Sequence, residues 1–420
     1  MGDGANSAAV GRRGRMRFSA RVLESRVYRR IWLSGFLFSN ARWVEIIASG
    51  WIVLALTGSP FLVGLTGFFR VLPMLVFGSI FGALADRFTR VNILLSIHAV
   101  GLGAAICLAI TFRHGGAPLA LIYPLIFVLG CGTAADFSAR ASLIDEVQER
   151  ALLASSMSLE ALSTSGAKIS AGLITGVLLS AGGAGLAYSY LALLYGAGLI
   201  WIWAFKPLLP ARQAATGSVR VISSLHGGWA AALRNPVVRG VFFVTIVVNI
   251  LVFPYQQLIA IVAKDILSVG PLWMGVLAGA DGVGGILTGA WLTFGAGARR
   301  PGAMFIGGAI GAAAMLVGLA LSPVFALSLA IQFGYGVCTG LFGAHQAALV
   351  LSATPPESRA RALGLIATAI GLTPIGMLLI GGLSSAAGAQ VTMAAMAGLG
   401  FLGLLLVLIF NPQLRAARIE

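Results

Sequence analysis

The stretch that decides the fold is a short charged link, GALADRFTR at residues 82–90, which joins two long apolar runs at about 61–85 and 91–112. A helix of about 20 apolar residues crosses a bilayer core, so each run can span a membrane. Of the 420 residues, 58% are hydrophobic and 10% are charged, whereas a soluble domain carries about 25% charged residues. The mean hydropathy is +0.95. These values predict a polytopic all-α membrane protein and exclude a soluble fold or a disordered chain.

Apolar runs of spanning length recur along the whole chain. Turn-forming links such as TGSP at 57–60 and GGAP at 115–118 separate them. An outer-membrane barrel would instead show alternating segments of roughly ten residues. Twelve spans are predicted, at about 31–56, 61–85, 91–112, 118–139, 155–180, 184–205, 239–262, 270–295, 302–321, 323–351, 361–384 and 388–411.

The basic residues predict the orientation of these spans. With twelve spans, one membrane face collects the N-terminal arm and nearly every loop arginine, while the other face collects only Arg113 and Lys264. The basic face is cytoplasmic by the positive-inside rule, so both termini are expected in the cytoplasm of a cell that holds the protein in its inner or plasma membrane. The arm's arginines favour contact with anionic lipids over nucleic acid because they precede a span directly.

The longest polar connection follows the sixth span and divides the chain six plus six. An offset of 211 residues aligns Gly64 with Gly275 and Arg70 with Asp281, which favours two pseudo-symmetric six-helix bundles. The predicted units are a cytoplasmic arm, a first bundle, a cytoplasmic linker, a second bundle and a cytoplasmic tail, at 1–30, 31–205, 206–238, 239–411 and 412–420.

The link at 82–90 resembles the loop signature of the major facilitator superfamily, in the position where that family carries it. The stretches WIVL at 51–54, RVLP at 70–73 and ARASLI at 139–144, with Asn249 in the seventh span, resemble the branch that contains the enterobactin exporter and macrolide efflux proteins. The resemblance implies the major facilitator fold, with twelve transmembrane helices, and drug:proton antiport. The span-5 stretch GAKISAG at 166–172 lacks the proline that exporters of this superfamily usually carry there.

The resemblance also implies a conformational latch in this link. Asp86 would cap the N-terminus of the eleventh span, where free N–H groups and the helix dipole favour an anion. Arg90 would pair with an acid at the end of the fourth span, for which the sequence offers Asp136. Gly82 and Arg87 complete the predicted latch.

Ionisable side chains inside the spans are costly, so they are expected to face a cavity or one another. Asp281 is the first candidate for proton coupling because glycines flank it and no opposite charge lies near it in sequence; Glu45 is the second. Arg42 lies three residues from Glu45 and could pair with it. Lys168 could balance Glu160 or bind an anionic substrate, and the sequence leaves both open. The remaining polar candidates for a substrate cavity are Asn40, Arg42, Arg70, Lys168, Asn249, Tyr255, Gln256, His345 and Gln346.

The predicted function is secondary active transport by alternating access, in which a proton-coupled exporter expels a bulky small molecule such as an antibiotic or siderophore. The alternatives are a lipid or lysophospholipid carrier and a non-transporting, receptor-like protein. No enzyme motif, cofactor site or metal spacing is present, and the three cysteines are far apart. The expected partners are the small-molecule substrate, protons and membrane lipids, and the expected state is a monomer.

Overall fold

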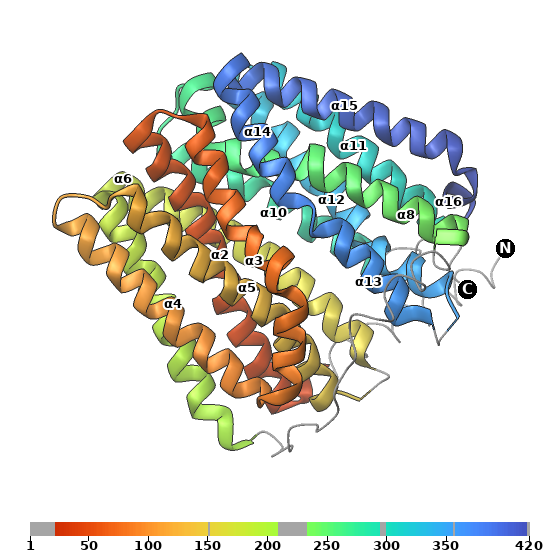
Figure 1. The fold of residues 1–420 in the computed structure, drawn as a ribbon, viewed down its shortest axis with the longest axis horizontal. Helices are drawn as coiled ribbons and strands as arrows, with labels where there is room; N and C mark the ends of the chain where they lie inside the picture. The colour runs from red at the N-terminus through yellow and green to blue at the C-terminus, as the bar shows by residue number, and fades with distance from the viewer. Residues whose placement is uncertain (1–21, 150–151, 209–232, 295–299, 356–357, 418–420) are drawn as a thin grey trace.

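The computed structural model describes residues 22–149, 152–208, 233–294, 300–355 and 358–417 (Figure 1). Within these ranges the regular structure is entirely helical. The predicted arm at 1–30 is described only from residue 22, and the predicted linker at 206–238 only at its two ends. For residues 78–87 the helical backbone is described but the side chains are not.

The first bundle consists of five helical elements. The helix at Arg26–Thr57 is capped at its N-terminus by Ser25, whose hydroxyl accepts a hydrogen bond from the Tyr28 N–H over 3.2 Å, and at its C-terminus by Gly58, whose positive φ of 62° stops the helix. The elements are α2 (Arg26–Thr57), α3 (Pro60–Arg87), α4 (Arg90–Arg113), α5 (Leu119–Val147) and α6 (Leu153–Phe205).

The long element α6 is a hairpin of two helices. Gly183, with φ 65° and ψ −157°, breaks it in the middle. The hydroxyl of Tyr28 donates to the Ser156 carbonyl near the start of α6, and the Trp201 indole near its end donates to the Arg30 carbonyl. Both ends of α6 therefore lie beside the first turns of α2, so the chain crosses the bundle twice within α6.

The second bundle contains two broken traverses. One combines α8 (Pro236–Val247), η3 (Val248–Val252), η4 (Phe253–Leu258), α9 (Ile259–Ile261) and η5 (Val262–Ile266). Its regular hydrogen bonding is interrupted around Pro254, which has no N–H to donate. The other consists of α13 (Arg359–Ile370) and α14 (Thr373–Ala387). The remaining elements are α10 (Pro271–Phe294), α11 (Pro301–Leu321), α12 (Phe325–Ser352), α15 (Ala389–Phe410) and the short α16 (Pro412–Ala416).

These elements make twelve helical traverses in two bundles of six, as the sequence predicts. Ten helices in the described part are long and apolar enough to cross a membrane. That number counts the α6 hairpin once and leaves out α2, which carries Arg42 and Glu45 among other polar residues. Counting the two arms of α6 separately and including α2 gives twelve traverses. Because this number is even, α15 ends at the same side of the molecule at which α2 begins.

The two bundles meet at one end and diverge at the other (Figure 1). We call the end that carries the glycine links at Gly58, Gly116 and Gly388 the closed end, and the opposite end the open end. A Cβ on Gly64 of α3 would lie 2.7 Å from the Gly381 Cα of α14, so only glycine permits this approach. The backbones of the two bundles thus contact each other directly near the closed end.

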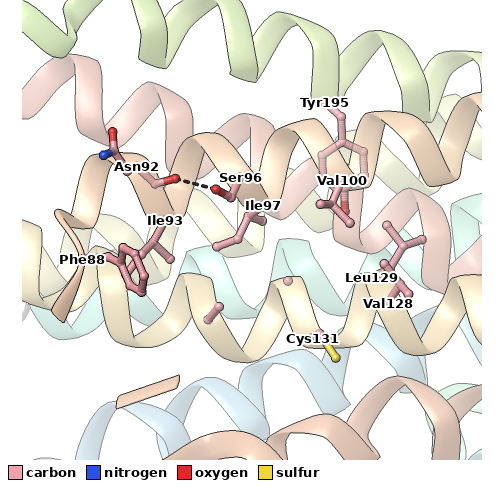
Figure 2. A pocket seen from close by; sticks show the side chains of 13 residues that line it. Phe88, Asn92, Ile93, Ser96, Ile97, Val100, Val128, Leu129, Cys131 and Tyr195 are labelled. Carbon is pink, nitrogen blue, oxygen red and sulfur yellow. Dashed lines mark hydrogen bonds between the residues drawn. The ribbon is translucent and has the colours of Figure 1, made fainter. Parts of the chain in front are cut away.

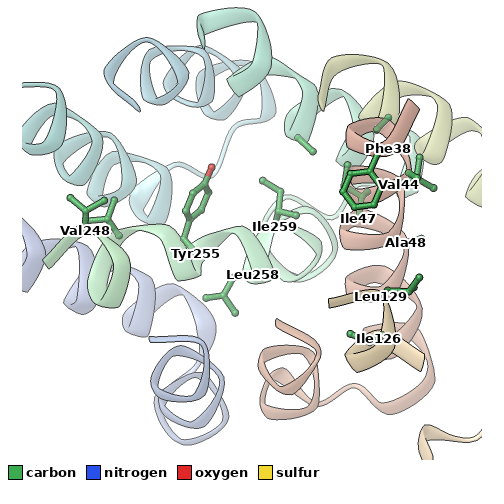
Figure 3. Close-up of a cluster of buried hydrophobic side chains, with 14 of the residues drawn as sticks. Phe38, Val44, Ile47, Ala48, Ile126, Leu129, Val248, Tyr255, Leu258 and Ile259 are labelled. Atoms are coloured by element: carbon green, nitrogen blue, oxygen red, sulfur yellow. The ribbon is translucent and has the colours of Figure 1, made fainter. Parts of the chain in front are cut away.

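The contact between α6 and α10 also depends on glycines that let the two backbones approach closely. A Cβ on Gly172 would lie 2.6 Å from the carbonyl oxygen of Gly275, and a Cβ on Gly176 would lie 2.8 Å from the Pro271 carbonyl. Figure 3 shows a third contact, where apolar side chains of α2, including Ile47, lie near the segment that carries Leu258 and Ile259. Small residues let helices approach closely in a membrane.

Candidate functional site

An ion pair joins the two bundles at the centre of the molecule. The Lys168 ammonium of α6 pairs with the Asp281 carboxylate of α10, and the two residues are 8% and 6% exposed. The pair is possible because Gly282 lets α10 approach the α6 backbone closely: a Cβ there would lie 2.8 Å from the Ser165 carbonyl. Asp281 therefore has the opposite charge that its sequence neighbourhood lacks, and Lys168 binds this acid rather than Glu160.

Trp43 of α2 supports the ion pair from the first bundle. The Lys168 Nζ lies 4.3 Å from the centre of the indole ring, and the Arg42 guanidinium carbon lies 5.5 Å from it. Cations at this distance are attracted to the face of an aromatic ring. Within the described residues Arg42 has no acid within 4.0 Å, and its Nε has no hydrogen-bond partner.

Two cavities meet at Asp281. A small one lies between the bundles and is lined by Trp43, Ile46, Ile47, Lys168, Tyr255, Gln256, Ile259, Ala278, Asp281 and Gln332. A larger one of about 450 Å³ extends toward the open end between α6, α10 and α12. Its lining residues are Met157, Ala161, Leu162, Ser165, Asp281, Gly285, Gly289, Leu292, Thr339, Gly340, Gly343 and Ala344. The carboxylate is thus accessible from the open-end side.

Glu45 pairs with Arg70 and not with Arg42. The Arg70 guanidinium donates to the Glu45 carboxylate over 2.8 Å and to the Ser49 hydroxyl over 3.2 Å, all inside the first bundle. Arg42 and Glu45 are three residues apart on α2, yet Arg70 of α3 takes the carboxylate. Arg70 and Asp281 are related by the internal repeat but bind different partners.

Further polar side chains form hydrogen bonds within and between the bundles, and of those named next only Tyr255 and Gln332 line the small cavity. The Asn40 amide donates to the Ser170 hydroxyl over 2.6 Å within the first bundle. Across the bundles, the Thr66 hydroxyl donates to the Gln257 side chain over 3.1 Å. In the second bundle, the Gln332 amide donates to the Tyr255 hydroxyl over 2.7 Å.

Sequence reasoning missed Gln332 and Tyr335, whose ring lies 4.7 Å from that of Tyr255. Gln332 could have been recognised as a lone amide in an apolar run.

Three predicted cavity residues lie elsewhere in the second bundle. Asn249 accepts a hydrogen bond from the Thr373 hydroxyl over 2.9 Å, and the Gln346 amide donates to the Thr245 hydroxyl over 2.7 Å. The His345 Nδ1 bonds to the carbonyl of its own helix one turn earlier. These side chains join α8, η3, α12 and α14, and the linings given above for the two cavities do not include them.

The predicted pairing of Arg90 with Asp136 is wrong in this structure. Arg90 pairs with Glu146 over 3.1 Å, whereas Asp136 pairs with Arg140 on its own helix. Asp136 lies ten residues before Glu146 on α5, about 15 Å deeper along the helix, so Arg90 at the start of α4 meets Glu146 instead. The side chains of Gly82, Asp86 and Arg87 are outside the described part, and their predicted latch role is untested.

A further groove of about 350 Å³ lies away from the ion pair, between α4 and α5 with Tyr195 of α6 at its edge (Figure 2). Its lining is mainly apolar and includes Phe88, Val100 and Leu129. Ser96 donates to the Asn92 carbonyl of its own helix, so it does not bridge the groove. No ionised side chain is among its lining residues.

Two six-helix bundles with a buried ion pair and cavities between them define a secondary transporter of the major facilitator fold. The family described as transmembrane secretion effector matches residues 19–419, and the chain belongs to it. No curated protein matches the chain significantly. The resemblance to the enterobactin-exporter branch stays a prediction.

Solved structures of low identity share the fold. A peptide transporter in complex with alafosfalin is 11% identical with a TM-score of 0.73, over 96% of this chain and 99% of that one. A nucleoside transporter is 13% identical with a TM-score of 0.71, over 91% and 99%. A bacterial homologue of the human lysosomal transporter Spinster, inward-facing and occupied, is 15% identical with a TM-score of 0.64, over 94% and 96%.

Proposed function

We propose that this protein is a proton-coupled exporter of a bulky small molecule, and that Asp281 carries the coupled proton. The observation that carries the proposal is the Lys168–Asp281 pair, since it joins the two bundles and adjoins the cavity that extends toward the open end. A carboxylate between two bundles can couple its own protonation to their movement because protonation removes the charge that holds Lys168. The family description supports outward transport.

The open end is assigned to the cytoplasm in this proposal. Among the described residues, this end carries Arg26, Arg29 and Arg30 at the start of α2, Arg234 before α8 and Arg415 after α15, whereas the closed end carries Arg113 and Lys264. The positive-inside rule places such a face in the cytoplasm. In this proposal the structure corresponds to an inward-facing carrier in which Lys168 pairs with Asp281 and the cavity is accessible to cytoplasmic substrate.

The proposed cycle follows from these positions. Substrate enters the cavity between α6, α10 and α12 and displaces Lys168 from Asp281. The open end closes, the glycine contacts at the closed end separate, and substrate leaves on the other side of the membrane. Asp281 takes up a proton there, the bundles return, and the proton leaves to the cytoplasm as the Lys168 pair forms again. One carboxylate thereby exchanges a proton for a substrate by alternating access.

The test is transport by purified protein in proteoliposomes, with a substrate identified from a growth-inhibition panel of cells with and without the protein. We expect Asp281→Asn to abolish transport driven by a pH gradient while the protein still inserts into the membrane. The matched control is Asp265→Asn, because Asp265 is an exposed acid near the closed end. Normal gradient-driven transport by Asp281→Asn would show that the proton is carried elsewhere, and Glu45→Gln tests the second candidate.

The α4–α5 groove favours a second candidate function, a lipid or lysophospholipid carrier. Its apolar lining and the exposure of Phe88 and Val100 suit an acyl chain at the bilayer-facing side of the first bundle. Flipping of a fluorescent lysophospholipid by the same proteoliposomes tests this function. Val100→Trp should reduce flipping by filling the groove, with Val391→Trp, an exposed position on α15, as the control.

A further inference from the structure

The interior of the membrane region holds a second unusual carboxylate. More than a turn and a half from the helix ends, the described traverses contain four acids and four bases. Three ion pairs join six of these groups: Arg70–Glu45, Arg140–Asp136 and Lys168–Asp281. The two left over are Arg42 and Glu160. Glu160 of α6 thus has no ion-pair partner within 4.0 Å among the described residues.

Glu160 lies beside an arginine whose hydrogen bonds are directed elsewhere. The Arg140 Nε donates to the Asp136 carboxylate over 3.0 Å and its Nη2 to the other oxygen over 2.5 Å. Its Nη1 donates to the Ile31 carbonyl over 3.1 Å and to the Ser34 hydroxyl over 3.0 Å. The Glu160 Oε1 is buried and has no hydrogen-bond partner among the described residues. Arg140 therefore lies between Asp136 and Glu160, and of these two acids it is hydrogen-bonded to Asp136.

Gly35 of α2 creates the space in which Glu160 and Arg140 approach each other. A Cβ at position 35 would lie 2.9 Å from the Glu160 Oε2 and 3.0 Å from the Arg140 Nη1. Both groups therefore occupy the volume that a side chain on α2 would fill. The absence of that side chain brings a carboxylate from α6 and a guanidinium from α5 to the same point on α2.

We propose that Glu160 is a proton-binding site in the first bundle, separate from Asp281. Arg140 can balance one of its two neighbouring acids, and a second ionised carboxylate in apolar surroundings is costly. Proton binding converts the Glu160 carboxylate to a neutral acid, with no other bond made or broken, and Arg140 stays with Asp136. When the proton leaves, Arg140 is the cation available to the new carboxylate, so it moves between the two acids.

The groups that face Glu160 come from two elements. From α5 these are Asp136 and Arg140, and from α2 it is Tyr28, whose hydroxyl is already committed to the Ser156 carbonyl over 2.9 Å. The nearest further cations along α2 are Arg30, five residues before Gly35, and Arg42, seven residues after it. The sites at Glu160 and Asp281 thus have separate partners, although α6 carries both Glu160 and Lys168.

Infrared difference spectroscopy tests proton binding without a substrate. Full-length protein in lipid nanodiscs is titrated from alkaline to acidic pH, and the carboxylic-acid C=O bands that appear are compared between variants. We expect Glu160→Gln to lose one band that the wild type shows. The control Glu149→Gln, at an exposed position just before α6, should retain it. A Glu160→Gln spectrum identical to the wild type overturns the proposal.

A second variant covers the case in which Glu160→Gln does not fold. Gly35→Ala keeps every titratable group but places a methyl between Glu160 and Arg140, so we expect the same number of bands with one displaced in frequency. An undisplaced spectrum contradicts the assignment.

The use of this proton in transport rests on the proposed function, but its binding does not. If Asp281→Asn transports normally while the Glu160 band persists, the coupling at Asp281 fails and the Glu160 site stands. If Glu160→Gln keeps the band while Asp281→Asn stops gradient-driven transport, the reverse holds.

Discussion

The glycine contact between α6 and α10 makes the conformational equilibrium open to a direct test. In Gly172→Ala the new Cβ would lie 2.6 Å from the Gly275 carbonyl oxygen, about 0.8 Å closer than the 3.4 Å at which ordinary van der Waals contact begins. The atoms nearest to this Cβ belong to the backbone of α10, so they cannot rotate away as a side chain could. Overpacking of this kind costs about 1–3 kcal/mol. In the proposed cycle this contact separates when the closed end opens, so the cost applies to the present state alone.

We therefore expect Gly172→Ala to shift the population by about 5- to 150-fold toward the state in which the closed end is open. Spin labels at Leu56 on α2 and Val391 on α15, which are 51% and 61% exposed, report the distance between the bundles at that end. The three native cysteines are first replaced by alanine. Pulsed electron paramagnetic resonance should show a longer distance in Gly172→Ala.

The matched control is Gly398→Ala on α15, where no atom of the described residues lies within 4 Å of the new Cβ. The same distance distribution in Gly172→Ala and in Gly398→Ala would refute the reasoning, because it would mean that the glycine contact does not set the balance between the two states.

Three further predictions concern stability, measured as melting temperatures of the purified protein in detergent. Lys168→Met leaves a buried charge without its partner and should cost about 3–5 kcal/mol, while adding Asp281→Leu should recover most of this loss; a double variant as unstable as the single one contradicts the pairing. Gly183→Ala forces a side chain into a backbone conformation at φ 65° and ψ −157° that is nearly exclusive to glycine, so we expect a cost of about 1–3 kcal/mol. An unchanged melting temperature would mean that the hairpin turn tolerates a Cβ. Gly130→Ala directs a methyl against the Arg70 carbonyl inside the first bundle, so it should lower the melting temperature without changing the distance between the bundles. A longer distance would show that packing within one bundle also controls the open and closed ends.

The sequence predicted the helical traverses well because membrane insertion depends on a local property. Each span needs a run of apolar residues, and the runs around residues 82–90 are apparent without any tertiary information. Two traverses are not continuous α-helices, and both interruptions have local causes. Pro254 interrupts the seventh traverse with non-α turns, and Gly371 separates α13 from α14, neither of which changes the number of traverses.

The partners of the charged residues were much harder to predict. Arg42 and Glu45 are close in sequence, yet Arg70 takes the Glu45 carboxylate from another helix. Lys168 had Glu160 on its own helix as one expected partner, and it binds Asp281 of the other bundle. Spacing along one helix gives the face on which a side chain lies, but a long side chain pairs with whichever group the neighbouring helix brings within reach.

The sequence by itself determined that this chain is a twelve-span membrane protein of two related halves, and that few ionisable groups lie inside it. Hydrophobicity is additive along the chain, so these properties are fixed by composition and order. The tertiary structure decided which charged residues pair, which end of the molecule is closed, and that Glu160 has no ion-pair partner among the described residues. Those features depend on how helices distant in sequence rotate and approach one another. Glycines such as Gly35 and Gly172 set that approach, because each helix comes as close as the missing side chain allows.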